Sequence, residues 1–509
     1  MTGTLPSLDY SFRRLVNILG PERVSRSPME RLMHSHDFAS LPKIALLQWK
    51  MIPDFVVVPK TVEEVSRLVE FAFEAGLPII PRGGGSGLVG GAVPNRGGIL
   101  VDMRRMDRIG AVDPERRLLT VQAGRAWKEI ADFAAARGMF LPIAPLGAPA
   151  STLGGWFANG GVGIGSYKYG DARDIVTDMQ VVLPSGEALR TADGTVDLSV
   201  AFGNLNPAFF GSEGTIGLIV EATLQLAPKP EALVPLTYSF KDLWSAREVP
   251  GTIAGSDLEP YNVAVMDPVH LAFMRTVRPE TPDPQALVNV SLDGPKDEVA
   301  AAAAELDALL GGLGGKKLGE DVAKAQWDGR FDLYPARRIT GGLVLTETEF
   351  PTPAYVEMLR RAARVARRLR MQVAVNSFLV DRNTVAVNPY FLMEEDSPLG
   401  PTALAFVKKF GDVAFALGGH PEGLGLFTAF NFPKMHKGAT GIYEAVKTQL
   451  DPHRKVNPGK MTEVWTRYDL PIVNVIPPEI MGFGLDVAAF LRRLKPTSDR
   501  YVKIPGGPR

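Results

Sequence analysis

The sequence of 509 residues contains no cysteine, which excludes disulfide bonds, thiolate catalysis, zinc–thiolate sites and an iron–sulfur cluster held by the chain itself. Histidine is scarce as well, with only six present. A histidine-rich metal site would use most of them, so we do not expect such a site. Neither charge sign is in excess, since 56 Lys and Arg residues balance 56 Asp and Glu residues, and this argues against nucleic acid as a partner. The longest apolar stretch, residues 470–491, is broken by Pro477, Pro478, Glu479 and Asp486. We therefore expect no membrane span and, with no targeting segment visible, a cytoplasmic location.

The remaining composition is that of an ordinary globular protein, with 45% hydrophobic and 22% charged residues, in a chain too long for one hydrophobic core. From Asp54 onward, apolar strand runs, a helical spacing and glycine loops alternate, which is typical of an α/β unit with a ligand loop at a strand end. Lys229-Pro230 marks the clearest boundary, after which the pattern predicts an α+β domain with an antiparallel sheet. We divide the chain into a lead-in, a ligand-loop domain, a cap domain, a returning segment and a tail: residues 1–50, 51–230, 231–430, 431–465 and 466–509.

A glycine-rich loop gives the first chemical signal. An apolar strand over residues 77–80 leads through Arg82 into Gly83-Gly84-Gly85-Ser86-Gly87 and Leu88. Glycines adopt positive φ and allow a ligand close to the backbone, and consecutive N–H groups form a nest for phosphate oxygens. Because the loop leaves a buried strand, we interpret it as a phosphate-binding loop rather than a flexible surface loop. Its spacing is neither that of a nicotinamide Rossmann motif nor that of a P-loop.

Two further glycine-rich segments follow in order. Residues 145–163 include Ser151-Thr152-Leu153-Gly154-Gly155, where Thr152 is expected to cap a helix whose free N–H groups face a pyrophosphate. Residues 211–219 read Gly-Ser-Glu-Gly-Thr-Ile-Gly-Leu-Ile. Each segment alone is only a weak indication of a binding site. The occurrence of all three in this order is much more specific.

In this order the segments resemble the flavin domain of FAD-linked oxidoreductases of the p-cresol methylhydroxylase (PCMH)/vanillyl-alcohol oxidase superfamily, closest to the D-lactate, glycolate and D-2-hydroxyglutarate dehydrogenase branch. Arg173-Asp174, Asp451-Pro452 and residues 457–460 match as well. The resemblance covers residues 50–230 closely and residues 231–465 more loosely. It implies an α+β protein, in which a PCMH-type FAD-binding domain of two α/β subdomains carries an α+β cap with an antiparallel sheet.

The resemblance also implies where FAD lies. Its pyrophosphate would sit on the first glycine loop, its adenine end near Ile219, and Asn457 would return to the flavin from the C-terminal segment. The expected cofactor-binding residues are Arg82, Gly83, Gly84, Gly85, Ser86, Gly87, Leu88, Pro145, Gly147, Thr152, Gly155, Asn159, Gly160, Glu213, Gly214, Ile219 and Asn457. Some family members tether FAD through a histidine. Because neither the glycine loop nor the Thr152 segment contains one, we expect noncovalent FAD.

The cap is expected to select the substrate. Trp327-Asp328-Gly329-Arg330 resembles the family's tryptophan–arginine motif, in which the arginine holds a substrate carboxylate in a bidentate fork. The alternative is a surface salt bridge, since Arg337 and Arg338 lie nearby and offer the same chemistry. Where hydroxy-acid members carry two metal-binding histidines, this chain has Phe378 and Val385, so we expect no metal.

The family's catalytic histidine lies in a Gly-Glu-His-Gly segment, and here the match departs. Residues 418–425 read Gly-Gly-His-Pro-Glu-Gly-Leu-Gly, so Glu422 takes the histidine's place and His420 is displaced by two positions. A carboxylate beside an apolar flavin can have a raised pKa and act as base, although Glu422 is equally a candidate structural cap of its loop. We therefore take Glu422 and Arg330 as candidate catalytic residues, with His420 and Tyr334 behind them.

The resulting hypothesis is an FAD-dependent enzyme acting on a CH–OH group of a hydroxy-acid-like small molecule, with hydride transfer to flavin N5 and electrons passed to an acceptor subunit or carrier. Three alternatives stay open at this point. The first is a metal-independent aromatic alcohol or alkylphenol oxidase or dehydrogenase, since aromatic residues surround the Glu422 segment in sequence. The second is a non-redox synthase like the alkyl-dihydroxyacetone-phosphate synthases, although their run of histidines is absent. The third is a noncatalytic flavin subunit of a larger complex.

Overall fold

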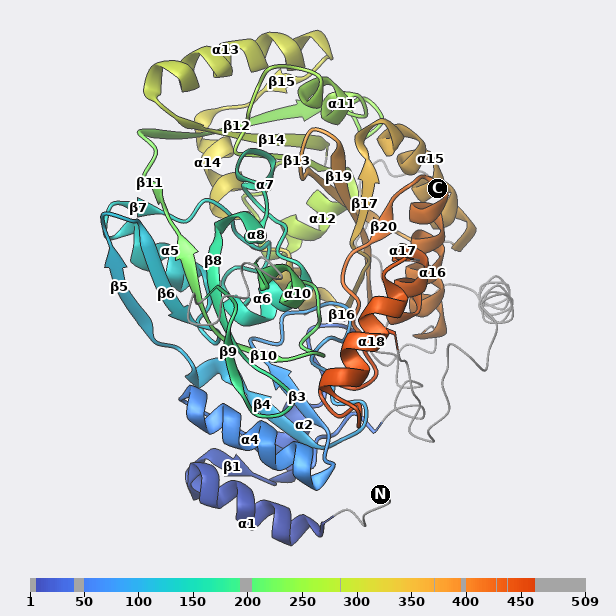
Figure 1. Ribbon diagram of the computed structural model, residues 1–509. Coiled ribbons are helices and arrows are strands. Elements are labelled where there is room, and N and C mark those ends of the chain that lie inside the picture. Colours follow the sequence, from blue (N-terminus) through green and yellow to red (C-terminus); the bar gives the residue numbers. More distant parts are fainter. Residues whose placement is uncertain are drawn as a thin grey trace.

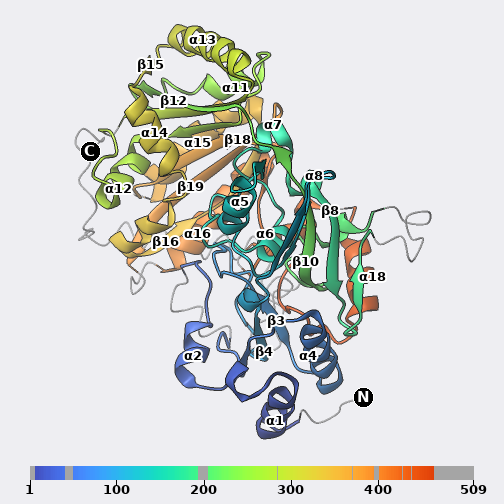
Figure 2. The ribbon, with the colours of Figure 1, turned by 90° about the vertical axis from the view of Figure 1, so that its left-hand side faces the viewer.

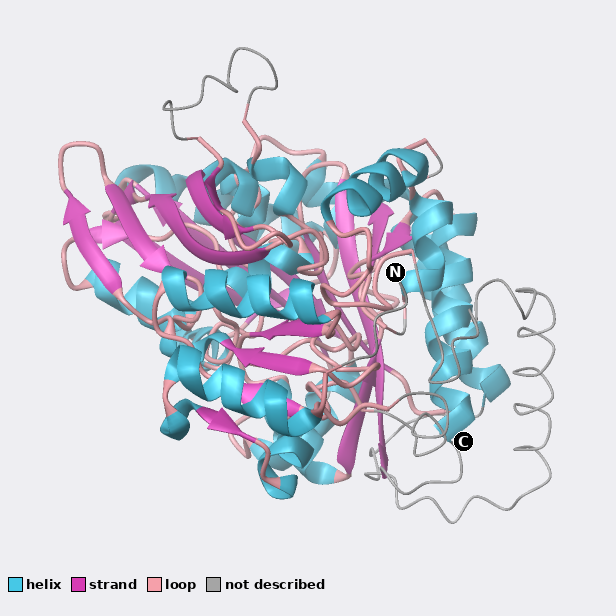
Figure 3. Ribbon diagram, turned by 60° about the horizontal axis from the view of Figure 1, so that its bottom comes forward, coloured by secondary structure: helices cyan, strands magenta, loops and turns pink. Residues whose placement is uncertain are grey.

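The computed structural model describes residues 6–40, 50–192, 204–283, 285–369, 371–394, 400–426, 428–436 and 438–462. The expected tail over residues 466–509 lies outside these ranges. Helices and strands are interspersed throughout the described chain (Figure 3). No helix in these ranges is both long and apolar enough to cross a membrane.

The first subdomain is a small mostly parallel sheet covered by helices (Figure 1). Its strands, in spatial order, are β1 (Val24–Ser25), β2 (Phe55–Val57), β4 (Ile99–Asp102) and β3 (Ile79–Arg82). Helix α4 (Val62–Ala75) follows β2 and buries its apolar positions against the sheet, and α1 (Leu8–Leu19) packs beside it. Thr61 caps α4 by accepting the N–H of Glu64, and Gly76 ends the helix in the left-handed conformation. Strand β3 thus delivers its C-terminal end, Arg82, directly into the first glycine loop.

The second subdomain is an antiparallel sheet of five strands. In spatial order these are β5 (Ile109–Asp113), β6 (Leu118–Gln122), β10 (Leu218–Gln225), β8 (Val176–Val182) and β9 (Ala188–Arg190). Helices α5 (Trp127–Ala135) and α6 (Leu153–Asn159) pack on it, with Trp127 and Phe157 fully buried. The remaining short elements of the described chain are α2 (Pro28–Met33), α7 (Ser166–Tyr169), α8 (Ala172–Ile175), α10 (Asn206–Phe209), β7 (Met139–Phe140) and β11 (Ala227–Pro228).

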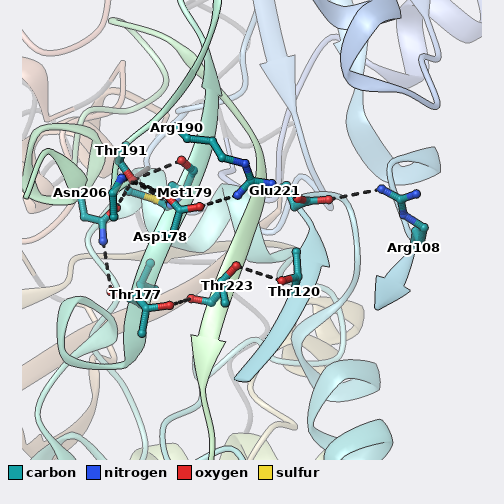
Figure 4. Close-up of polar contacts among 12 residues, drawn as sticks. Arg108, Thr120, Thr177, Asp178, Met179, Arg190, Thr191, Asn206, Glu221 and Thr223 are labelled. Atoms are coloured by element: carbon teal, nitrogen blue, oxygen red, sulfur yellow. Dashed lines mark hydrogen bonds and ion pairs between the residues drawn. The ribbon is translucent and has the colours of Figure 1, made fainter. Parts of the chain in front are cut away.

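The alternating pattern of residues 221–227 predicts a strand with one more exposed face. The pattern holds from Ala222 to Leu226, where half-buried Thr223 and Gln225 alternate with buried apolar residues, although β10 is the central strand, paired with both β6 and β8. Only Glu221 departs from it, and both Glu221 and Thr223 have cross-strand partners (Figure 4). The buried Glu221 carboxylate lies 2.8 Å from Arg190 Nη2 and 3.4 Å from Arg108 Nη2. The hydroxyls of Thr223 and Thr120 are 2.9 Å apart.

The cap is built on a nine-stranded sheet, whose order is β15-β12-β14-β13-β18-β19-β17-β20 with β16 also paired to β19 (Figure 2). Its strands are β12 (Ala232–Phe240), β13 (Asn262–Met266), β14 (Ala286–Gly294), β15 (Lys316–Lys317), β16 (Gly341–Leu345), β17 (Thr348–Pro351), β18 (Ala374–Leu379), β19 (Thr384–Glu394) and β20 (His420–Pro421). All its pairings are antiparallel.

The two faces of the cap sheet differ. Helices α11 (Val249–Ala254), α13 (Lys296–Gly312), α15 (Tyr355–Leu369) and α16 (Gly400–Ala416) build the largest hydrophobic core against one face. The other face is divided. Helix α12 (Pro268–Val277) packs on apolar residues of β16, β18 and β19, whereas α14 (Glu320–Asp328) contacts β12 and β14, which carry polar residues on this side. Lys168 Nζ, on α7, lies 2.7 Å from the buried Asp293 carboxylate on β14, so this polar side is tied to the second subdomain.

The chain then returns to the first subdomain. Helices α17 (Phe432–Met435) and α18 (Thr440–Leu450) lead to Val456, which forms a parallel bridge with Ile79 of β3. The whole arrangement confirms the expected fold class, a two-part ligand-loop domain carrying a cap with an antiparallel sheet.

Candidate active site

A large cavity lies where the two subdomains and the cap meet. It encloses about 1410 Å³ of space free of protein atoms, part of it open to solvent. Three glycine-rich segments that are far apart in sequence form its walls, namely residues 82–91, 145–162 and 213–219. The cap adds Glu347, Phe378 and Glu422. The three segments whose order was the specific signal in the sequence therefore line one cavity.

The first loop lies so close to the second that a side chain at two of its positions would overlap atoms of the second loop. A Cβ on Gly84 would overlap the backbone carbonyl oxygen of Ala150, and a Cβ on Gly83 would overlap the hydroxyl of Thr152. Ser86 Oγ and Ser151 Oγ, 3.0 Å apart, join the two loops directly. The loop is therefore a fixed part of the wall and not a flexible surface segment.

Thr152 precedes α6 as expected, but its hydroxyl does not cap the helix. Thr152 Oγ1 is buried and has no hydrogen-bond partner among the described residues. A buried polar atom without a partner costs free energy, so a hydroxyl at the wall of a cavity indicates a ligand that completes it. The expected cap is therefore wrong, whereas the place of Thr152 at the cavity wall is the one that the resemblance implied for a cofactor-binding residue.

The opposite wall is held by Glu213 and Asn457, both with positive φ. Glu213 Oε1 accepts the N–H of Leu424 at 2.9 Å, and Asn457 Nδ2 donates to the carbonyl oxygen of Glu213 at 2.6 Å. Burial raises the pKa of Glu213 to about 7. The Oδ1 atom of Asn457 is buried without a partner in the described chain. Glu213 and Asn457 thus join the ligand-loop domain to the segment that carries Glu422.

The structure brings together every residue predicted to bind the cofactor except Gly160, which does not line the cavity. Gly160 instead ends α6, where its N–H donates to the carbonyls of Trp156 and Phe157. Asp37, from the lead-in, lines the cavity although no motif pointed to it. Its carboxylate accepts the N–H of Ala39 at 3.1 Å, and burial raises its pKa to about 6.

At the cap side of the cavity three glutamates gather, of which the sequence had pointed only to Glu422. The Glu422 carboxyl shares a hydrogen bond with that of Glu349, and Glu347 adds a third carboxyl within electrostatic range. Burial, together with these two carboxyls, raises the pKa of Glu422 well above its usual range. Burial and Glu349 raise the pKa of Glu347 to about 7. The run Thr346-Glu347-Thr348-Glu349 carried a period-2 signal that places both glutamates on one face of a strand.

The other two candidate catalytic residues lie differently. His420 does not line the cavity, and its side chain is 46% exposed, with Nε2 3.6 Å from Glu349 Oε2. Tyr334 begins the 3₁₀ segment Tyr334–Ile339, and its side chain is outside the described part of the structure.

A second, smaller cavity adjoins the first and shares Leu146 and Phe378 with it. Its floor is the polar face of the cap sheet, and α14 closes it with Trp327 and Arg330. The amide and hydroxyl side chains that line it are Thr237, Asn262, Asn289, Ser291, Gln326 and Asn376. No motif had pointed to these residues, because each is an isolated polar residue in its strand or helix.

Arg330 is the one cation that lines this second cavity in the described structure. Its guanidinium lies 3.9 Å from the ring centroid of Trp327 and 4.4 Å from that of Phe331, and Nη1 donates to the carbonyl of Trp327 at 2.6 Å. The nearby carboxylates have other partners, since Asp328 pairs with Lys324 and Asp332 with Arg278. Arg330 therefore makes no ion pair within the described chain, and burial lowers its pKa.

The stretch compared with the family's metal motif is a hairpin. Phe378 faces the two cavities, whereas Val385 points into the hydrophobic core on the other side of the sheet. Asp381 and Asn383 form the exposed turn between β18 and β19, where Asp381 Oδ1 accepts the N–H of Asn383 at 2.6 Å. The described residues contain no group of three or more His, Cys, Asp or Glu residues that is arranged to hold a metal ion.

Comparisons with known families decide what the large cavity holds. A model of the FAD binding domain matches residues 53–192, and a model of the C-terminal domain of FAD linked oxidases matches residues 229–461. The chain belongs to the FAD-linked oxidases. It is thus an FAD-dependent oxidoreductase, and the resemblance to the PCMH/vanillyl-alcohol oxidase superfamily is confirmed.

Individual FAD-linked oxidases show the range of similarity. Glycolate oxidase subunit GlcD of Bacillus subtilis is 28% identical over 462 residues, covering 88% of this chain and 96% of GlcD. The mitochondrial D-lactate dehydrogenase (cytochrome) of Arabidopsis thaliana is 33% identical over 43% of this chain and 38% of its own. The solved structure of p-cresol methylhydroxylase with substrate bound has a TM-score of 0.75 at 17% identity, covering 89% of this chain and 96% of that one, and so shows a shared fold.

The residues around the cavity fit FAD. The glycine wall leaves no room for side chains, and Thr152 Oγ1 and Asn457 Oδ1 are buried acceptors that await a partner. The backbone of residues 83–87 would hold the pyrophosphate, and Glu347, Phe378 and Glu422 are the lining residues that the cap contributes.

Proposed function

We propose that this protein is a dehydrogenase that oxidises the CH–OH group of a small hydroxy acid and passes the electrons to a partner acceptor. When bound, FAD supplies a two-electron acceptor for a hydride. The chain's own residues bind and orient the acid, exclude water and take the hydroxyl proton. The names of the relatives, a glycolate oxidase subunit and a D-lactate dehydrogenase, support this substrate class and the need for an acceptor partner.

The observation that carries the substrate class is the state of Arg330. The Arg330 guanidinium is half-buried and has no carboxylate partner in the described structure, and a bidentate carboxylate is the ligand that matches its geometry. The aromatic rings of Trp327 and Phe331 fix the plane of the guanidinium beside the second cavity. Arg337, the alternative in the sequence, donates instead to the carbonyls of Gly341 and Phe38. A substrate carboxylate on Arg330 would lie in the second cavity, which adjoins the large cavity at Leu146 and Phe378.

Glu422 is the proposed base. It lines the large cavity, whereas His420 does not, and a carboxylate there can accept the hydroxyl proton as the C–H bond breaks.

The alternative of an aromatic substrate gains no support from the described residues of the cap. Phe378 lines the cavities, but Tyr390, Phe391 and Phe432 are buried in hydrophobic packing away from them.

Substitution of Arg330 by lysine tests the carboxylate assignment. Lysine keeps the charge and loses the fork, so we expect the apparent affinity for the hydroxy acid to fall by about tenfold or more. The maximal rate of anaerobic flavin reduction should change much less. Arg337→Lys is the matched control, and it should leave the affinity unchanged. An Arg330→Lys protein with wild-type affinity would return Arg330 to a structural role.

We also propose that FAD is bound noncovalently. Among the described residues that line the large cavity there is no histidine, tyrosine or cysteine, the side chains that form flavin tethers. The purified protein should be yellow with stoichiometric FAD, and acid or heat should release all of the flavin into the supernatant, where its spectrum is measured. Flavin that stays with the precipitated protein would contradict this proposal.

A further inference from the structure

The base proposed above belongs to a short chain of titratable groups that leads out of the cavity. Strands β17 and β20 pair antiparallel, with Glu349 directly opposite His420. Glu422, two residues after His420, donates its N–H to the carbonyl of Glu347 at 2.8 Å, so the pairing of the two segments continues beyond the strands. Directly opposite residues of an antiparallel pair project from the same face, so Glu349 and His420 lie side by side.

Exposure to water rises from the two glutamates to the histidine. Glu422, which lines the large cavity, and Glu349 are both half-buried, whereas the His420 side chain is 46% exposed. Glu422 and Glu349 share a hydrogen bond between their carboxyls, and Glu349 Oε2 lies 3.6 Å from His420 Nε2. A small rotation of either side chain, or one bridging water, closes the 3.6 Å gap between Glu349 and His420.

The ring of His420 has a definite orientation. Its Nδ1 lies 3.4 Å from the carbonyl oxygen of Pro421, which can only accept a hydrogen bond. With the ring proton on Nδ1, Nε2 presents its lone pair to Glu349 and can receive a proton from it.

We propose that Glu422, Glu349 and His420 form a proton exit, in which the substrate's hydroxyl proton passes from Glu422 to Glu349 and leaves to solvent through His420. This inference rests on the proposed hydroxy-acid dehydrogenase function. The balance is simple: the C–H bond breaks with its electron pair, which the bound cofactor accepts, the O–H bond breaks and the C=O bond forms. One proton remains, and a buried carboxylate that kept it would be unable to accept the next.

Other titratable groups surround this chain. Two carboxyls in hydrogen-bond contact hold a single proton between them, because like charges at that distance disfavour double ionisation. Glu347 adds a third carboxyl on the cavity side, and burial with Glu349 raises its pKa to about 7. Arg173 of α8 and Glu349 interact electrostatically, as do His436, after α17, and His420. A second proton taken up by Glu422 therefore exceeds what the pair holds, and its way out is through Glu349 to the exposed histidine.

The test follows flavin reduction and proton release separately in the holoenzyme, after anaerobic mixing with a 2-hydroxy acid that bleaches the wild-type flavin. A pH-indicator dye in weakly buffered solution reports the proton. In His420→Gln we expect proton release to slow by about tenfold or more, and added imidazole to restore it. His436→Gln is the matched control, a neighbouring exposed histidine outside the chain, and should release protons at the wild-type rate without imidazole.

A second reading does not depend on turnover. Infrared spectra of the resting holoenzyme should contain the band of a protonated buried carboxylic acid that disappears in Glu422→Gln and shifts in Glu349→Gln, because the two groups share one proton. If wild-type flavin bleaches and His420→Gln releases protons as fast as wild type with no effect of imidazole, the exit is overturned and the hydroxy-acid function stands. If no 2-hydroxy acid bleaches the flavin, the proposed function fails. In that case the absence of the shared carboxylic-acid band overturns the chain as well.

Discussion

Replacing Glu422 with glutamine is expected to slow anaerobic flavin reduction by ~10²–10⁴-fold, the usual contribution of a general base. Glutamine keeps the size of the side chain and removes its basicity. The Glu422 carboxyl lines the cavity beside Phe378, and its raised pKa gives it the proton affinity that a base needs. FAD content should be unchanged, since Glu422 is a cap residue and the glycine wall is intact.

The role of Glu422 as base also predicts how the rate of flavin reduction changes with pH. Only the ionised carboxylate accepts a proton, and burial with Glu349 and Glu347 raises the pKa of Glu422. The wild-type rate should therefore rise with pH as this carboxyl loses its proton, and Glu422→Gln should lack that rising limb. Glu357→Gln is a suitable control, because Glu357 pairs with arginines on the outer helix α15 and lines neither cavity. A Glu422→Gln protein that reduces flavin at the wild-type rate would exclude Glu422 as the base.

The parts of the site that the sequence predicted are those in which residue type is dictated locally. Positive φ and close backbone approach require glycine, so the walls of the cavity are visible as glycine-rich segments. The N-cap at Thr61 is visible for a similar reason, because its hydroxyl satisfies the first turn of α4 from within the same few residues. The order of such local signals was enough to identify both the family and the cofactor.

The sequence pointed to Glu422 and His420 but not to Glu349, because the geometry of this proton exit depends on a long-range register. Glu349 and His420 are 71 positions apart, and a strand of two residues, β20, brings them together. A shift of one residue would turn Glu349 to the other face. Period-2 alternation predicts that Glu347 and Glu349 share a face, but not which face meets the flavin cavity. Asp37 was missed because it reaches the cavity from the lead-in, which contains no recognisable motif.

Within β10, burial departs from the local pattern only at Glu221. Thr223 and Gln225 are half-buried between buried apolar residues, as the alternation of residues 221–227 predicts, whereas Glu221 is buried. Arg190 and Arg108 neutralise Glu221 from neighbouring strands, and a long-range ion pair of this kind allows a charged residue in a buried strand. Polar residues that line the second cavity were invisible for the converse reason, because they are spread over four strands and a helix.

Alanine at Gly84 is expected to abolish stable FAD binding while the fold persists. The added Cβ would overlap the carbonyl oxygen of Ala150 and lie 2.9 Å from its carbonyl carbon. Both are backbone atoms, so no side-chain rotation relieves the overlap, and the first loop must separate from the second. Overpacking of this kind costs about 3 kcal/mol or more, which corresponds to about a hundredfold loss of affinity when relief requires the loop to leave its binding geometry.

The measurement is the flavin absorbance that stays with the protein after desalting, with circular dichroism as the check on folding. Gly251→Ala is the matched control: it adds the same methyl group to another domain, at a helical glycine whose Cβ would meet nothing within 4 Å. That variant should retain its FAD. Gly83→Ala should fall between the two, because its Cβ meets the side chain of Thr152, which can rotate, and not the backbone. A Gly84→Ala protein with full flavin content would show that the two loops separate without cost, and the rigid glycine wall would then not be what holds the cofactor.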